Sequence, residues 1–451
     1  MRRPFTAALA VLAATSVVAA QTPVAPQTPA TPVFPTLQAQ LPTPTAPPLA
    51  LADAEARAIA NHPRVIAARN QATAETAATR EAGSFRYPTV VGSLTGVDAL
   101  SNSRIAAGAL NNPIIYNRFS SGIMINQLIT DFGRTGNLVA SASLHAQASA
   151  LDISATEQDL ELAVANAYFA ALGAQAVLNV AADTVHTRQV VVDQIAALVQ
   201  NLQKTDVDLS FANVDLGEAQ LLLVQAQNDF LARQADLGNA MGEHGDQIYP
   251  LIDPTAGSAQ PPPPLDPLTA AALSGRPDLA SARLDRDAAR RLEAAEADLE
   301  RPTVSFSGAA GVTPLRQDTL TNRYAAAGVN LGIPVFNGHL FGAERSEAEA
   351  RADAEDQRVR EVENQVAHDV RVAWLQASAA FQRIGLTDQI VAQAVQGQTL
   401  AQARYDNGLG SIVELSQAQL NATQARVAQA SARFEYAAAL ALLRYSAGQT
   451  P

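Results

Sequence analysis

Two hydrophobic periodicities divide this chain into short strands and very long helices. In Val329–Ile333, three aliphatic residues share one face, and Asn330 lies on the other. This period of two predicts a half-buried strand. From Val359 to Ile384, apolar residues recur every three or four positions instead. That spacing predicts a helix with one persistently buried face.

Further strands are predicted by the same alternation. Val304 and Phe306 alternate with polar residues, whereas Ser121 and Gln127 interrupt the apolar face of the segment from Phe119 to Ile129. Such segments are typical of half-buried strands or of one wall of an outer-membrane barrel. Eight of the aromatic residues lie at predicted strand ends, which favours an interfacial girdle over a simple core border. They are Phe85, Tyr87, Tyr116, Phe119, Phe132, Tyr324, Phe336 and Phe341.

No proline interrupts the two longest predicted helices, which run from Arg134 to about Asn201 and from His339 to about Tyr405. About 65 residues at ~1.5 Å each span roughly 100 Å. The second helix ends at Asn407-Gly408, a pair that supplies left-handed conformers. Thr205-x-x-Asp208 and Ser411-x-x-Glu414 then fit the start of another helix.

The second half of the chain repeats the first, with a period of about 206 to 214 residues. Pro63 aligns with Pro277, and Val207–Asn213 aligns with Val413–Gln419. The period is too long for a solenoid and indicates a duplicated unit of helix, strand, strand, very long helix and helix. We assign residues 50–250 and 265–448 to the two copies and 251–264 to a linker. The first helix of each copy is expected at 53–83 and 265–299.

The amino-terminal segment has the pattern of an export signal in residues 1–20, followed by a proline-rich leader in 21–49. No later segment reads as a membrane-spanning helix. The chain has no cysteine, and its formal net charge of −12 argues against nucleic acid as a partner. The six histidines form no ligand pair at helical spacing, and no phosphate-binding or nucleophile motif occurs. We therefore expect no enzyme, cofactor or metal site.

These features together resemble the TolC family of outer-membrane channel-tunnels. The resemblance covers residues 50 to 448. Beyond the duplication and the tip sequence, it includes three further features. These are the His62-Pro63 and Arg276-Pro277 pairs, the two Pro-Thr-Val strand starts, and the junctions Asp131–Arg134 and Ile333–Gly338.

The resemblance implies a mostly α fold with a transmembrane β-barrel. Three chains would supply four strands each to a twelve-stranded barrel, and their helices would form a periplasmic tunnel. The protein would be a passive exit duct in the outer membrane of a Gram-negative bacterium, for drug efflux or type I secretion. A periplasmic adaptor and an inner-membrane transporter would be its partners. An exported structural coiled-coil or adhesin-like protein is the alternative.

Charged residues gather at the expected helical tips. Lys204, the only lysine, Asp206, Asp208, Tyr405, Asp406 and Glu414 are the gate candidates. By resemblance, Glu414 matches an acid at the channel constriction and Tyr405 a residue that ties neighbouring helices shut. We expect Lys204 to pair with Asp406 or Glu414. Helix capping by Asp208 and Glu414 is the competing interpretation, and one residue can do both.

Overall fold

The computed structural model describes residues 43–44, 46–100, 117–244, 247–255, 257, 259–315 and 321–449. The expected signal peptide and leader residues 21–42 and 45 lie outside this part. The first repeat contains α1 (Leu51–Asn61), α2 (Pro63–Ser84), β1 (Thr89–Val97), β2 (Arg118–Thr130), α3 (Arg134–Gln200) and α4 (Asp206–Ala240). The second contains α5 (Leu265–Gly275), α6 (Pro277–Ala297), the 3-10 turn η1 (Asp298–Glu300), β3 (Thr303–Leu315), β4 (Arg323–Gly332), α7 (Leu340–Asp406) and α8 (Ile412–Ser446).

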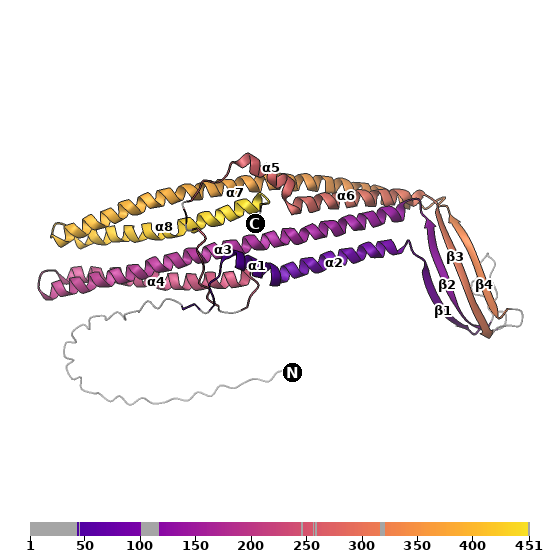
Figure 1. Cartoon of the computed structure of the whole chain (residues 1–451), viewed down its shortest axis with the longest axis horizontal. Coiled ribbons are helices and arrows are strands. Elements are labelled where there is room, and N and C mark those ends of the chain that lie inside the picture. Colours follow the sequence, from indigo (N-terminus) through magenta and orange to yellow (C-terminus); the bar gives the residue numbers. More distant parts are fainter. Residues whose placement is uncertain are drawn as a thin grey trace, which may run out of the picture. The chain divides into compact units, whose positions relative to one another are not determined.

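The duplication extends to the lengths of the elements. Helices α3 and α7 each have 67 residues, and α4 and α8 each have 35. In Figure 1 the sheet lies at one end of the long helices, and the α3–α4 and α7–α8 turns lie at the other. The predicted bounds of both long helices are confirmed to within one residue.

The first predicted helix of each copy is wrong in one respect, because it is two helices. His62 and Arg276 are extended, with ψ of 131° and 126°, and the next helix starts at the following proline. A proline lacks the N–H that would continue the preceding helix, and it disfavours helical backbone in the residue before it. Each break packs against a left-handed glycine after the last helix of its own copy, His62 against Gly242 and Arg276 against Gly448.

The four strands form one antiparallel sheet in the order β1-β2-β3-β4. Residues directly opposite each other in such a sheet share a face. Val304 pairs with Leu331, Phe306 with Val329, and Ser305 with Asn330. The sheet therefore has an apolar face and a polar face, which confirms the predicted alternation in β3 and β4. Ile333 was expected in the strand but lies beyond it, because β4 ends at Gly332 before Pro334.

Gln127, which breaks the predicted alternation of β2, pairs with Phe306 and lies on the apolar face. Its side-chain amide donates hydrogen bonds to the carbonyls of Arg86 (2.9 Å) and Leu128 (2.6 Å). A polar residue is tolerated at this end of the strand because backbone groups satisfy it.

Helix α3 is central to the packing, since it contacts α1, α2, α4, α6 and α8, and α7 packs on α8. The stripe on α7 is buried, with Val366, Val370 and Ala377 fully inaccessible, as predicted. Contrary to the sequence expectation, α3 is long and apolar enough in one window to cross a membrane. Half of that window is buried against the rest of the chain, which accounts for its apolar composition.

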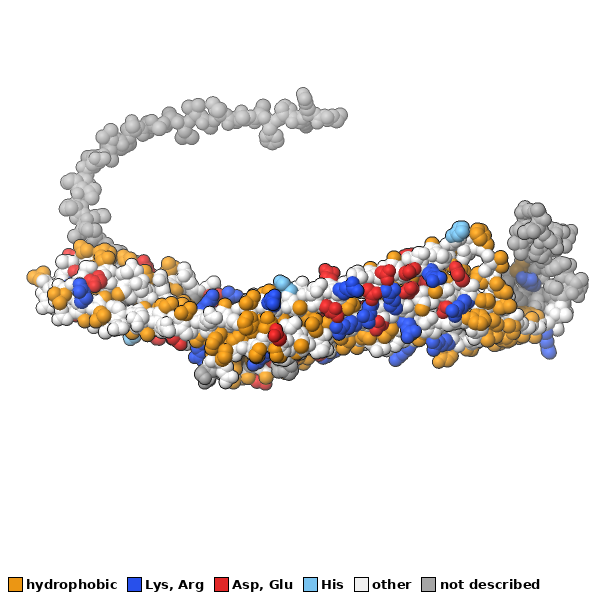
Figure 2. All heavy atoms as spheres, turned by 90° about the horizontal axis from the view of Figure 1, so that it is seen from above, with side chains coloured by type: hydrophobic (Ala, Val, Ile, Leu, Met, Phe, Trp, Pro, Cys, Tyr) orange, Lys and Arg blue, Asp and Glu red, His pale blue; other side chains and the backbone are white. Residues whose placement is uncertain are grey.

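Charged side chains gather in a band over part of the surface shown in Figure 2. Ion pairs join α6 to α7, including Arg283–Glu363 at 2.8 Å and Arg290–Asp353 at 2.8 Å. Because these groups are partly exposed, each pair stabilises the contact by only about 0–1 kcal/mol.

Candidate functional site

The tips, defined here as residues 200–208 and 406–414, have the same backbone conformation. Leu202 (φ 56°) and Gly408 (φ 70°) are both left-handed. The next amide in each, that of Gln203 or Leu409, donates to a carbonyl five residues earlier, at 2.9 and 2.8 Å. This is the Schellman helix end, for which glycine is the usual residue. The leucine in the first tip therefore keeps the geometry of its repeat at the cost of backbone strain.

The helix starts that follow the two tips use their acids differently. At α4, the Asp208 carboxylate accepts from the Thr205 amide (3.0 Å), and the Thr205 hydroxyl accepts from the Asp208 amide (3.3 Å). At α8, Ser411 accepts from the Glu414 amide (3.2 Å), but the Glu414 carboxylate lies 3.0 Å from Nε of Arg404. Asp208 thus completes a capping box, whereas Glu414 forms an ion pair with the preceding helix.

Burial and hydrogen bonding act in opposite directions on the pKa of Asp208. Partial burial raises this pKa, but hydrogen bonds from the Thr205 hydroxyl and amide, with the charge of Lys204 nearby, lower it overall. The carboxylate is therefore held in the charged form that the capping box requires.

The predicted partner of Lys204 is wrong. Its ammonium group donates to the backbone carbonyl of Tyr405 (3.2 Å) and lies 3.7 Å from the centre of the Tyr405 ring. This is a cation–π contact rather than a salt bridge. Asp406 instead accepts from Gln402 on its own helix (2.8 Å), and Glu414 is occupied by Arg404. Lys204 nevertheless links the two hairpins, as the sequence suggested.

Tyr405 is the buried centre of this link, with 3% of its surface exposed. It packs in a cluster that combines residues of α3 and α4 with Ile412 and Leu415. Burial raises the pKa of its hydroxyl to about 12, and the nearby Asp208 carboxylate adds to the effect. The hydroxyl lies beside the Asp208 carboxylate of the other hairpin, although no hydrogen bond of good geometry joins the two groups.

A buried polar group joins the hairpins further from the tips. Asp215 accepts a hydrogen bond from Ser416 (2.6 Å) and lies 3.6 Å from the guanidinium of Arg188. Arg188 is 8% exposed, and burial lowers its pKa despite the neighbouring Asp215. Asp215 follows the tip acids in sequence, but its side chain lies between the helices, where Ser416 and Arg188 contact it.

Arg404 was missed by sequence reasoning. Gly410 lies against the ion pair that Arg404 forms with Glu414. A Cβ at position 410 would lie 3.1 Å from Cβ of Arg404 and 3.2 Å from the Glu414 carboxylate. Glycine thus leaves room for the Arg404–Glu414 pair. The sequence shows Gly410 beside a turn but gives no reason to connect it with this arginine.

The aromatic residues proposed as a girdle fall into two groups. Phe85, Tyr87, Phe132, Phe336 and Phe341 lie around the junction of the sheet and the helices. Four of them are exposed and Phe341 is partly exposed. Phe119 lies near the other end of the sheet, and Tyr116 is outside the described residues.

Tyr324 does not belong to a girdle on the apolar face. Its side chain lies on the polar face across Gly122 and Gly311, where an added Cβ would clash with its hydroxyl group or with the ring carbon that carries it. These glycines make room for the ring. The alternation of side chains along β4 places Tyr324 on the same face as Asn330.

Known proteins resemble the chain in both sequence and fold. A family model described as outer membrane efflux protein matches residues 56–243 and 268–449. The chain is 24% identical over 346 residues to outer membrane protein TolC of Escherichia coli (strain K12), covering 72% of this chain and 68% of that protein. The structure of CusC has a TM-score of 0.78 at 18% identity and covers 88% of this chain and 91% of that chain. VceC from Vibrio cholerae has a TM-score of 0.75 at 19% identity, with 88% and 96% covered.

A small antiparallel sheet continued by two long helical hairpins is thus the fold of outer-membrane channel proteins. The chain belongs to the outer membrane efflux protein family. It is an outer-membrane export channel protein that extends into the periplasm. The expected family, fold class and location are confirmed, and the alternative of a structural coiled-coil or adhesin is wrong.

Proposed function

We propose that three copies of this chain close one twelve-stranded barrel and form the passive exit duct of a tripartite export system. A periplasmic adaptor and an inner-membrane transporter are its partners, and they open the duct at the helical tips. The observation that carries the proposal is the pair of open edges, β1 and β4, on a sheet with one apolar face. A four-stranded sheet cannot remain in lipid with unpaired edges, because nothing there satisfies the backbone groups.

The helices support the same head-to-tail assembly. Within one chain α4 packs on α3, α3 on α8, and α8 on α7, so α4 and α7 are the outer helices. Both carry exposed apolar side chains: Val207, Phe211, Val214, Leu221, Val224 and Leu231 on α4, and Leu375, Leu386, Ile390 and Leu400 on α7. Joining β1 to β4 of the next copy also brings α4 towards α7 of that copy. A heterologous contact of this kind gives a closed ring when the rotation closes.

The absence of cysteine makes cross-linking a direct test of closure. Val91→Cys is combined with a single cysteine at successive positions of β4, and outer membranes are oxidised. We expect one register to give a ladder that ends at the trimer. A ladder that continues beyond three, or monomer at every register, would refute the ring. Each single-cysteine variant serves as its control.

Neighbouring residues of β4 provide a matched test of the lipid-facing side. Leu331→Arg should impair assembly in the membrane by about 2–4 kcal/mol if the residue lies near the midplane. Asn330→Arg should be tolerated, because Asn330 lies on the polar face that would line the lumen. The measurement is the yield of folded trimer in outer membranes, and equal yields from both variants would show that the faces are assigned the wrong way round.

A further inference from the structure

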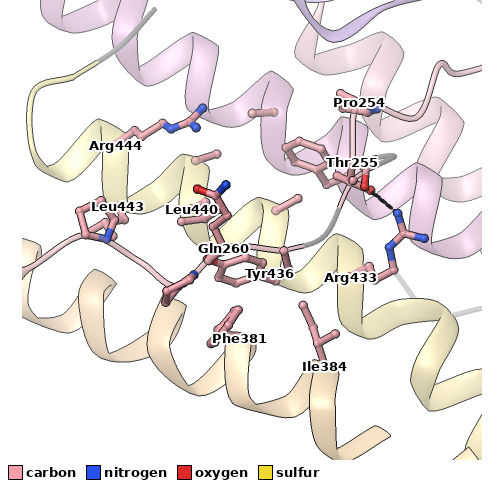
Figure 3. Close-up of a pocket in the computed structure, with 18 of the residues that line it drawn as sticks. Pro254, Thr255, Gln260, Phe381, Ile384, Arg433, Tyr436, Leu440, Leu443 and Arg444 are labelled. Atoms are coloured by element: carbon pink, nitrogen blue, oxygen red, sulfur yellow. Dashed lines mark hydrogen bonds between the residues drawn. The ribbon is translucent and has the colours of Figure 1, made fainter. Parts of the chain in front are cut away.

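A cavity of about 1050 Å³ lies between the long helices and the linker that joins the two repeats. Figure 3 shows Phe381, Ile384, Tyr436 and Leu440 facing it. Phe169 of α3 lines it as well. Its size matches that of pockets for drug-sized ligands, and its wall is largely apolar.

Described residues of the linker over this cavity are held by aromatic side chains of the helices. The Tyr436 hydroxyl donates to the Gln260 carbonyl, and Nε1 of Trp374 donates to the Pro263 carbonyl at 2.8 Å. Trp374 is the only tryptophan of the chain. Two aromatic side chains thus hold the backbone of Gln260 and Pro263 over the cavity.

Two carboxylates without a basic partner line the same cavity, Glu55 from α1 and Glu161 from α3. Within the described ranges, neither forms an ion pair. One oxygen of Glu161 is fully buried without a hydrogen-bond partner. Burial, and then repulsion from Glu161, raise the pKa of Glu55 to about 7. Both side chains are half-buried and close enough to repel each other, and no described basic group pairs with either, so this part of the cavity suits a positive charge.

The arginines that line the cavity do not supply that charge. Arg433 donates to the Thr255 carbonyl at 2.7 Å (Figure 3) and lies 3.9 Å from Asp253. Arg444 acts on Tyr436, where its charge partly offsets the burial that raises the pKa of the phenol. Neither arginine contributes to the raised pKa values of Glu55 and Glu161.

We propose that this cavity binds one amphipathic organic cation. The aromatic and aliphatic wall holds its apolar body, and Glu55 and Glu161 hold its charge. The site is separate from the tips and does not depend on the proposed trimer. Charge complementarity favours the cation over an anion or a neutral apolar molecule.

Isothermal titration calorimetry of the purified full chain in an uncharged detergent tests the proposal. The probe is tetraphenylphosphonium, and tetraphenylborate carries the same four phenyl groups with the opposite charge. We expect one saturable site per chain for the cation alone. Glu55→Gln and Glu161→Gln should each weaken it about tenfold, the factor that a loss of 1.4 kcal/mol produces. Glu363→Gln, on the α6–α7 surface, is the control and should leave the affinity unchanged.

Arg444→Gln is expected to increase the affinity for the cation, a result that a misfolded protein would not give. Removing a positive charge from the cavity should strengthen tetraphenylphosphonium binding several-fold. Circular dichroism of each variant checks that the helical content is kept. Equal binding of the two probes, or wild-type affinity in both glutamine variants, would overturn the proposal and leave only unspecific adsorption to the apolar wall.

Discussion

The two tips share one backbone and differ in how their side chains are used. Both helices end in a left-handed residue, and both following helices start at a hydroxyl cap. In the first tip the acid completes the cap and a lysine reaches across to the other hairpin. In the second tip the acid pairs with an arginine of its own hairpin. The two copies thus keep the same backbone conformation at their tips. Their side chains differ, and only the first tip supplies a residue, Lys204, that contacts the other hairpin.

This difference changes the interpretation of the tip acids. Asp208 is tied into a cap, Glu414 is paired with Arg404, and Asp406 bonds to Gln402. These carboxylates are therefore not free to form an acidic ring, and the Lys204–Tyr405 contact explains a closed tip better. Cation–π contacts contribute about 0.5–2 kcal/mol, and the upper part of that range applies when the groups are desolvated. Tyr405 is almost completely buried, so this contact is the strongest candidate for a closed-state link.

Among the tip substitutions, the largest expected effect is on channel conductance. Lys204→Ala removes both the ammonium–carbonyl bond and the ring contact, and it should favour the open tips by up to about 2 kcal/mol, or roughly 30-fold in the equilibrium. Single-channel recording in planar bilayers should show a higher conductance than in the wild type.

Tyr405→Phe is the matched control for this variant. It keeps the ring contact with Lys204 and removes only the hydroxyl that lies beside the Asp208 carboxylate. Conductance should stay near the wild-type value, because the Lys204 ammonium group keeps its contacts with the ring and with the backbone carbonyl of residue 405. If the phenylalanine variant opens and the alanine variant does not, the hydroxyl rather than the lysine closes the tips.

Removing the acids should separate capping from surface pairing. Asp208→Ala should lower the local stability of the α4 start by about 1 kcal/mol, since the bond from the Thr205 amide to the Asp208 carboxylate is lost while the Thr205 hydroxyl cap is kept. Glu414→Ala should cost less, about 0–1 kcal/mol, because its pair with Arg404 is largely exposed. Hydrogen exchange of the tip amides measures both. An equal loss of protection from exchange in both variants would show that the two acids stabilise their helix starts to the same extent.

The pH dependence gives a second readout for Asp208. Its folded pKa lies below the unfolded value, so its stabilisation is present above the unfolded pKa and is lost as pH falls through the folded pKa. The difference in exchange between the wild type and Asp208→Ala should therefore disappear in acid. A difference that persists at the lowest pH would exclude the charged cap as its source.

The sequence predicted the tips as elements but not as contacts. Periodicity and the Ser/Thr-x-x-acid pattern located the helix starts because these are local signals. The partner of Lys204 depends on how two hairpins some 200 residues apart pack together, and no local pattern records that. The break at Pro63 was a local signal that was passed over, since the apolar pattern continues across it. Tyr324 was assigned by its position at a strand end, although strand parity decides its face.

The smallest expected effect concerns the left-handed residue itself. Leu202→Gly should relieve a strain of about 1–2 kcal/mol, partly offset by the greater entropy of glycine in the unfolded chain, which leaves a gain of about 0.5 kcal/mol. Gly408→Ala should lose about 1 kcal/mol for the same reason in reverse. Both positions are open, with no atom within 4 Å of a Cβ at Gly408 and 93% of Leu202 exposed, so packing changes do not confuse the comparison. Hydrogen exchange of the Gln203 and Leu409 amides, which close the two turns, should move in opposite directions in the two variants. Slower exchange at Leu409 in Gly408→Ala would mean that the turn does not need a left-handed residue, and the equivalence of the tips would then fail.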